Sequence, residues 1–145
     1  SYKGLPKGVN YMVIGDPGVG KTTIILDMLS DLSVNSGARV LFVSVEMNEI
    51  DLAIYVQRFP KFQNLDILFV EGDFEQDSSG NKTFDTVSEV LSQGWDVIAI
   101  DSFYELQGIV KEEENITLKK AESKLLSLMK QQCKGGNARN INSLP

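Results

Sequence analysis

The fold follows from one segment near the start of the chain, Tyr11-Met12-Val13-Ile14-Gly15-Asp16-Pro17-Gly18-Val19-Gly20-Lys21-Thr22. Its apolar first part predicts a buried strand, because a parallel strand covered on both faces need not alternate. The part from Gly15 to Thr22 fits the pattern G-x-x-x-x-G-K-[S/T], which joins a strand to a helix in phosphate-binding loops. A glycine turn without a ligand is the alternative. Backbone N–H groups of such a loop, with the helix N-terminus, predict a phosphate site.

The residue types within this loop indicate separate roles. Lys21 is expected to reach the β- and γ-phosphates of a nucleoside triphosphate, and the Thr22 hydroxyl to bind Mg²⁺. Thr23 could reach the α-phosphate. The expected nucleotide-binding residues are Gly15, Asp16, Pro17, Gly18, Val19, Gly20, Lys21, Thr22 and Thr23.

The rest of the chain alternates short apolar runs with helical patterns, which predicts an α/β fold: a parallel sheet with helices on both faces. Strands are predicted at 11–14, 40–45, 67–70 and 95–101. Helices are predicted over 21–32, over 49–59 after an Asn48 cap, from a Thr83 cap to Gly94, and over 118–132. Residues Glu112–Glu114 are expected in a solvated loop, and Trp95 is expected to pack rather than to stack on a base.

Two acids follow predicted strands. Asp101 ends the run Val97-Ile98-Ala99-Ile100 and is expected at the carboxyl edge of the sheet, where it could hold Mg²⁺; a solvated strand-end acid is the alternative. Glu46 ends the second strand and could polarise the attacking water as a general base, or it could simply begin the next helix. Ser102, not an acid, follows Asp101, which favours Glu46 as the base.

These motifs resemble those of the RecA-like P-loop ATPases. The matching segments are the loop from Gly15 to Thr23, Val43-Ser44-Val45-Glu46-Met47 and Ile98-Ala99-Ile100-Asp101-Ser102, within a resemblance that covers about residues 4 to 133. The pattern is most similar to DnaB-type replicative helicases, whose second strand typically ends in Ser-Leu-Glu-Met. It also resembles the RadA/Sms and KaiC branches.

The resemblance implies an ATPase that uses ATP and Mg²⁺ between adjacent subunits of a homo-oligomeric ring or filament. It implies that Lys21 and Glu46 are catalytic, that Thr22 and Asp101 (the Walker B acid) hold the metal, and that single-stranded DNA is a partner. A DNA helicase is the first expectation. The alternatives are a RadA/RecA-type recombination ATPase, a KaiC-like signalling ATPase without DNA, and a phosphate-binding domain that performs no work.

The end of the chain departs from this family. RecA-like cores place a further strand between the P-loop strand and the Walker B strand, and nothing after Gln132 predicts a strand. We therefore expect residues 1–145 to form a single RecA-like domain that is incomplete at its C-terminus, and weak or inactive when isolated. A fragment of a longer protein is the first expectation, and a natural short form is the alternative.

The composition of the chain limits which disulfide, zinc and membrane-spanning features the protein can have. The chain has 145 residues, a formal net charge of −6, no His and one Cys, so an internal disulfide and the usual structural zinc site are excluded. No apolar run approaches the length of about 20 residues that spans a bilayer. The expected setting is a reducing cytoplasm, with no membrane partner.

Overall fold

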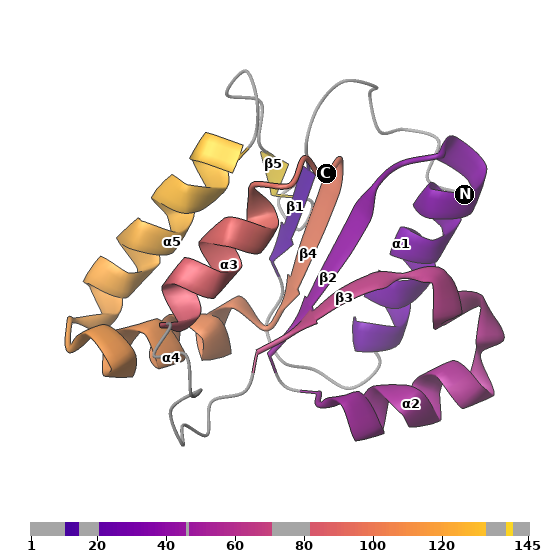
Figure 1. Ribbon diagram of the computed structural model, residues 1–145, viewed down its shortest axis with the longest axis horizontal. Helices are drawn as coiled ribbons and strands as arrows, with labels where there is room; N and C mark the ends of the chain where they lie inside the picture. The colour runs from indigo at the N-terminus through magenta and orange to yellow at the C-terminus, as the bar shows by residue number, and fades with distance from the viewer. Residues whose placement is uncertain (1–10, 15–20, 46, 71–81, 133–138, 141–145) are drawn as a thin grey trace.

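The computed structural model describes residues 11–14, 21–45, 47–70, 82–132 and 139–140 (Figure 1). The strands are β1 (Tyr11–Ile14), β2 (Val40–Ser44), β3 (Asp66–Phe69), β4 (Val97–Asp101) and β5 (Arg139–Asn140). The helices are α1 (Lys21–Ser36), α2 (Glu49–Arg58), α3 (Thr83–Leu91), α4 (Phe103–Glu114) and α5 (Leu118–Gln132), with a 3₁₀ helix η1 (Pro60–Asn64) after α2. This element order confirms the predicted α/β class.

The strands form one parallel sheet in the order β3-β2-β4-β1-β5. Because all of them run the same way, their carboxyl ends meet at one edge, which lies at the bottom of Figure 1. The segments that follow β2 and β4 leave from this edge, and α1 begins beside it. The topology thus brings together residues that are far apart in the sequence.

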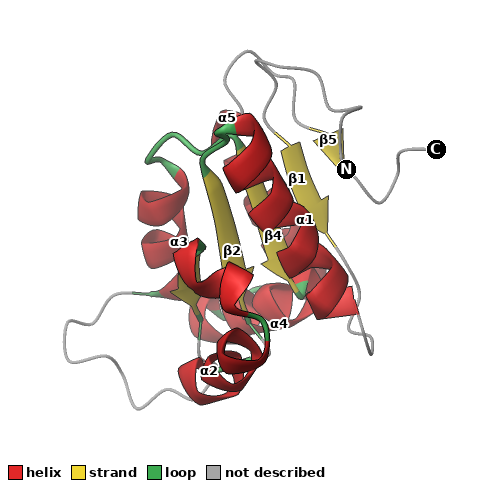
Figure 2. Ribbon diagram, turned by 90° about the vertical axis from the view of Figure 1, so that its right-hand side faces the viewer, coloured by secondary structure: helices red, strands yellow, loops and turns green. Residues whose placement is uncertain are grey.

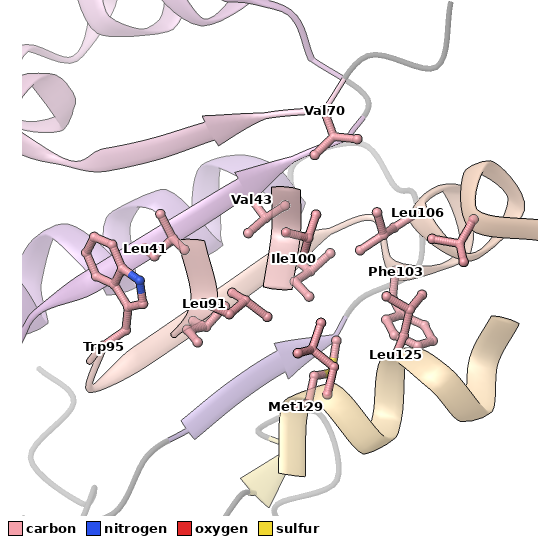
Figure 3. Packing of buried hydrophobic residues seen from close by; sticks show 14 of the residues in the cluster. Leu41, Val43, Val70, Leu91, Trp95, Ile100, Phe103, Leu106, Leu125 and Met129 are labelled. Carbon is pink, nitrogen blue, oxygen red and sulfur yellow. The ribbon is translucent and has the colours of Figure 1, made fainter. Parts of the chain in front are cut away.

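Helices cover both faces of the sheet, and alternate residues of the central strands serve two cores. Leu41, Val43, Ile98 and Ile100 face the core formed with α3, α4 and α5, part of which Figure 3 shows. Val40, Phe42, Val97 and Ala99 face the core formed with α1, α2 and η1. Because both faces are covered, β2 and β4 are buried at every position.

Several local predictions are confirmed. The Asn48 side chain caps α2 by accepting a hydrogen bond from the Asp51 N–H at 3.0 Å, and α2 ends before Pro60. Helix α1 runs past the predicted end at Leu32 to Ser36, and Gly37 then takes a φ of 65° that suits glycine.

Trp95 packs in the core, as predicted, and is 6% exposed. Its Nε1–H donates to the Val90 carbonyl at 2.7 Å, and the Arg39 guanidinium lies 4.5 Å from the ring centroid. The Arg39 side chain also donates to the Gln93 carbonyl at 2.6 Å. These contacts join the start of β2 to the end of α3.

The expectation of a solvated loop at Glu112–Glu114 is wrong, because these residues form the last turn of α4. Ser102 caps this helix by accepting from the Glu105 N–H at 3.2 Å, and Asn115 ends it in the left-handed conformation. Ser102 and Glu105 have the spacing of a capping box, so the signal was present in the sequence. The buried residues of the helix are Phe103, Leu106, Gln107 and Val110.

The predicted cap of α3 is also wrong. Thr83 is the first residue of the helix, and both its N–H and its hydroxyl donate to the Glu113 carboxylate at 2.9 Å. The neighbouring Glu114 pairs with Lys124 of α5, whose ammonium group also lies 4.3 Å from the Phe84 ring centroid. The acids at the end of α4 therefore connect α3, α4 and α5.

At β1, the strand order of the sheet differs from the order that the resemblance to RecA-like ATPases implies. Strand β5 follows Gln132, where no strand was predicted, and pairs with β1 at the edge that Figure 2 shows. On its other side β1 pairs directly with β4, from Tyr11 opposite Val97 to Ile14 opposite Ile100, so no strand lies between them. Within the described ranges, no helix has the length and apolar character that crossing a membrane requires.

Candidate functional site at the carboxyl edge of the sheet

Thr22 and Asp101 meet at the carboxyl edge of the sheet. Thr22 lies in the first turn of α1 and Asp101 is the last residue of β4. The Thr22 hydroxyl donates to Oδ2 of Asp101 at 2.5 Å, although 79 positions separate the two residues in the chain. The structure therefore joins a residue of the predicted phosphate loop to the predicted strand-end acid.

Asp101 is held firmly and is nearly closed off from solvent. It is 4% exposed, and its carbonyl accepts a hydrogen bond from the Val45 N–H at 2.8 Å. The peptide bond that follows it is cis, and Ser102 then caps α4. A buried carboxylate is costly unless it is hydrogen-bonded or binds a cation, and the Thr22 hydroxyl provides one such partner.

The N-terminus of α1 suits an anion. Its first turn contains no acidic residue and begins with Lys21, which is partly buried. The first N–H groups of a helix have no partners within it, and the aligned peptide dipoles make this end positive. A phosphate bound here would meet both the free donors and the lysine charge.

The side-chain oxygen atoms at this edge of the sheet are suitable ligands for Mg²⁺. Mg²⁺ prefers oxygen ligands and usually keeps several waters, binding through one or two protein groups together with substrate phosphates. Thr22 and Asp101 supply a hydroxyl and a carboxylate side by side. The described part of the chain contains no cluster of three or more His, Cys, Asp or Glu that could hold a metal.

A pocket of about 300 Å³ lies beside Thr22, between α1 and α2. Its other lining residues are Met47, Asp51, Ile54 and Tyr55. This volume is at the lower end of the range for small-molecule sites. Met47, Asp51, Ile54 and Tyr55 were not among the predicted site residues, and no sequence motif near them places them beside Thr22.

The predicted site residues divide into two groups. Lys21, Thr22, Thr23 and Asp101 are described, and Thr22 and Asp101 are in direct contact. Gly15, Asp16, Pro17, Gly18, Val19, Gly20 and Glu46 lie outside the described residues. The roles of both groups of residues in binding and catalysis remain predictions.

Comparison with known families identifies the class of protein. A family model described as an AAA domain matches residues 2–132, which is most of the chain. The chain belongs to this AAA domain family of P-loop ATPases. No curated protein and no solved structure matches it significantly. The family supports nucleotide binding and ATPase activity as a class, without distinguishing the DnaB-type branch.

Proposed function

We propose that this protein binds ATP together with Mg²⁺ at the carboxyl edge of its sheet. The observation that carries the proposal is the 2.5 Å contact between Thr22 and Asp101, beside a helix N-terminus that begins with Lys21. In this proposal the loop from Gly15 to Thr23 surrounds the phosphates, and Lys21 reaches the β- and γ-phosphates. Thr22 and Asp101 hold the ion.

We propose further that the protein hydrolyses ATP with Glu46 as general base. Support comes from the neighbours of Glu46, because Val45 donates to the Asp101 carbonyl and Met47 lines the pocket beside Thr22. When bound, Mg²⁺ neutralises charge that develops on the phosphate oxygens. The carboxylate of Glu46 would orient the attacking water and accept its proton, while Lys21 would stabilise the transferring phosphoryl group.

The finer proposal is a DNA-dependent motor of the DnaB type that works as a homo-oligomeric ring. It rests on the sequence Ser44-Val45-Glu46-Met47. The first residue of this motif, Ser44, ends β2 opposite Asp101 of β4, which supports the proposal. A recombination ATPase and a KaiC-like ATPase without DNA share most of these motifs and remain the alternatives.

Binding of ATP by the wild-type chain and two variants tests the central assignment. Lys21→Ala should weaken ATP binding at least about ten-fold in titration calorimetry, since a charged contact to phosphate is lost. Asp101→Asn should remove most of the gain in affinity that Mg²⁺ provides, while ATP binding without Mg²⁺ changes little. Lys61→Ala, at an exposed pair with Asp27, is the control. ATP affinity unchanged by Lys21→Ala would contradict the proposal.

The effect of DNA on turnover separates the branches. Single-stranded DNA should raise the rate of ATP hydrolysis by the full-length protein if it is a helicase or a recombinase. A phosphate-release assay with and without an oligonucleotide of mixed sequence provides the measurement. Robust hydrolysis that the oligonucleotide leaves unchanged would favour the KaiC-like alternative.

A further inference from the structure

Strand β4 passes directly into a helix whose first turn is capped by Ser102. Ser102 follows Asp101 in the chain and is 0% exposed. Its Oγ accepts a hydrogen bond from the Glu105 N–H at 3.2 Å, and its carbonyl accepts one from the Leu106 N–H at 3.2 Å. The Glu105 N–H belongs to the first turn, where a helix provides its donors with no partner of its own. The Ser102 hydroxyl therefore fixes the point at which the chain leaves the sheet and enters α4.

Helix α4 is itself packed firmly in place. Phe103, Leu106 and Val110 are between 0% and 8% exposed, and they pack in the same core as Ile100, the residue before Asp101. A close-packed core resists displacement of its side chains, so α4 is a rigid attachment for the chain that precedes it. The segment just after Asp101 is tied to this helix through the Ser102 cap.

On the strand side, the sheet holds Asp101. Its carbonyl accepts a hydrogen bond from the Val45 N–H at 2.8 Å, and the residue lies opposite Ser44 in the register of β4 and β2. Its carboxylate is buried and accepts a hydrogen bond from the Thr22 hydroxyl at 2.5 Å. The backbone that carries this carboxylate is therefore fixed on one side by the sheet and on the other by the Ser102 cap.

We propose that Ser102 is a positioning residue for Asp101. By capping α4, its hydroxyl restricts the backbone from which the Asp101 carboxylate reaches Thr22, and so keeps both oxygen donors in place for Mg²⁺. The part of this inference that concerns Mg²⁺ rests on the proposed function. Loss of a group that orients a metal ligand typically lowers metal affinity about 10- to 100-fold, because the ligand is then held less closely to the productive geometry.

Ser102→Ala removes the accepting oxygen and leaves the side chains of Thr22 and Asp101 unchanged. Titration calorimetry with ATP, in Mg²⁺ and in EDTA, gives the factor by which Mg²⁺ raises ATP affinity. We expect Ser102→Ala to lower this factor about ten-fold, while ATP affinity without Mg²⁺ stays within about two-fold. Ser102→Thr keeps the hydroxyl and should retain most of the factor. An unchanged factor in Ser102→Ala would overturn the inference.

Two variants control for a general loss of stability. Thr117→Ala removes the same kind of helix cap from the start of α5, where the Thr117 Oγ1 accepts from the Lys120 N–H at 3.1 Å. Ser30→Ala removes a buried serine hydroxyl of α1, which donates to the Lys61 carbonyl at 3.0 Å. Both variants should lower the free energy of unfolding and leave the Mg²⁺ factor unchanged. An equal loss of the factor in either control would show that Ser102 acts only through stability.

A double-mutant cycle tests the positioning without nucleotide or metal. Thr22→Ala removes the hydrogen bond to Asp101, and its effect on urea unfolding measures that contact. In the Ser102→Ala background this effect should shrink to less than about half, because the carboxylate is no longer held at Thr22. In the Thr117→Ala background it should keep its full size. Additive effects of Thr22→Ala and Ser102→Ala would overturn the inference, even if Mg²⁺ binds as proposed.

The two experiments separate this inference from the proposed function. A wild-type chain that binds ATP equally well with and without Mg²⁺ would contradict the proposed function, and the cycle would then decide whether Ser102 positions Asp101. If Ser102→Ala does not fold, Ser102→Gly takes its place, because glycine weakens an N-cap less than alanine does. Ser102→Gly also lacks the hydroxyl, so the same loss of the Mg²⁺ factor is expected, and a factor equal to that of the wild type would overturn the inference.

Discussion

At the residue scale, the contact between Thr22 and Asp101 is the feature on which the site depends. Asp101 is buried, and the Thr22 hydroxyl satisfies one of its oxygens. The same two oxygen donors are available to a cation that arrives with a nucleotide. Under the proposed function, in which Thr22 and Asp101 hold Mg²⁺, this one contact would couple the stability of the free protein to its affinity for Mg²⁺.

Substitution of Thr22 should reveal how much its hydrogen bond to Asp101 contributes to stability. Thr22→Ala should lower the free energy of unfolding by about 1–3 kcal/mol, because it leaves the Asp101 carboxylate without its hydroxyl partner. Thr22→Ser keeps the hydroxyl and should stay within about 0.5 kcal/mol of the wild type. Urea unfolding of the nucleotide-free chain measures both values. Equal destabilisation by the two substitutions would mean that the methyl group, not the hydroxyl, stabilises this position.

At the scale of elements, the C-terminal turn of α4 determines how the helices on one face are joined. The Glu113 carboxylate binds both donors of Thr83 at the start of α3, and Glu114 pairs with Lys124 of α5. A carboxylate at a helix N-terminus is favoured by the free N–H groups and the dipole. Glu113 thus provides the cap that the sequence next to α3 lacks.

Two adjacent glutamates offer a test of this junction. Glu113→Ala should destabilise the protein by about 1.5–3 kcal/mol, because two hydrogen bonds to a charged group are lost. Glu112→Ala should change stability by less than about 1 kcal/mol, since its partner Lys111 is also on the surface. Thermal or urea unfolding of the two variants makes the comparison. A larger effect at Glu112 would contradict the assignment of the junction to Glu113.

At the scale of the whole molecule, the two cores share β2 and β4. Phe42 and Val43 are adjacent in the sequence, but Phe42 faces the α1 side and Val43 the α3 side. Damage to one core therefore shifts strands that also form the other. The described part of the chain should unfold as one cooperative unit.

The single tryptophan makes this cooperativity measurable, because Trp95 lies in the core on the α3 side. Phe42→Ala, on the opposite face, should cost about 3–5 kcal/mol. It should shift the Trp95 fluorescence transition and the circular dichroism transition to the same lower urea concentration. Val34→Ala, at a side chain that is 74% exposed, is the control. A fluorescence midpoint that stays at the wild-type value would show that the cores unfold separately.

Much of the molecule follows from local patterns in the sequence. The strand, glycine-rich loop and helix around Gly15 to Thr22, the Asn48 cap and the burial of Trp95 depend on residues close together in the chain. The approach of Asp101 to Thr22 also followed, because parallel strands present their carboxyl ends at one edge. The spacing of Ser102 and Glu105 is also a local capping signal, and it marks the start of α4, a helix that is not among the predicted ones.

Other features depend on the tertiary structure. Glu113 and Thr83 lie 30 positions apart, and no pattern around either residue predicts that they meet. Strand β1 pairs with β5 on one side and with β4 on the other. These pairings are made by backbone groups, so the side chains in the sequence do not identify which strands are neighbours. The local spacing of apolar residues determines which segments become helices and strands, because backbone hydrogen bonding and side-chain burial recur at a fixed interval of residues in each. Which helices and strands contact one another is determined by the packing of the sheet and its two cores, because contacts between distant residues form only in the packed structure.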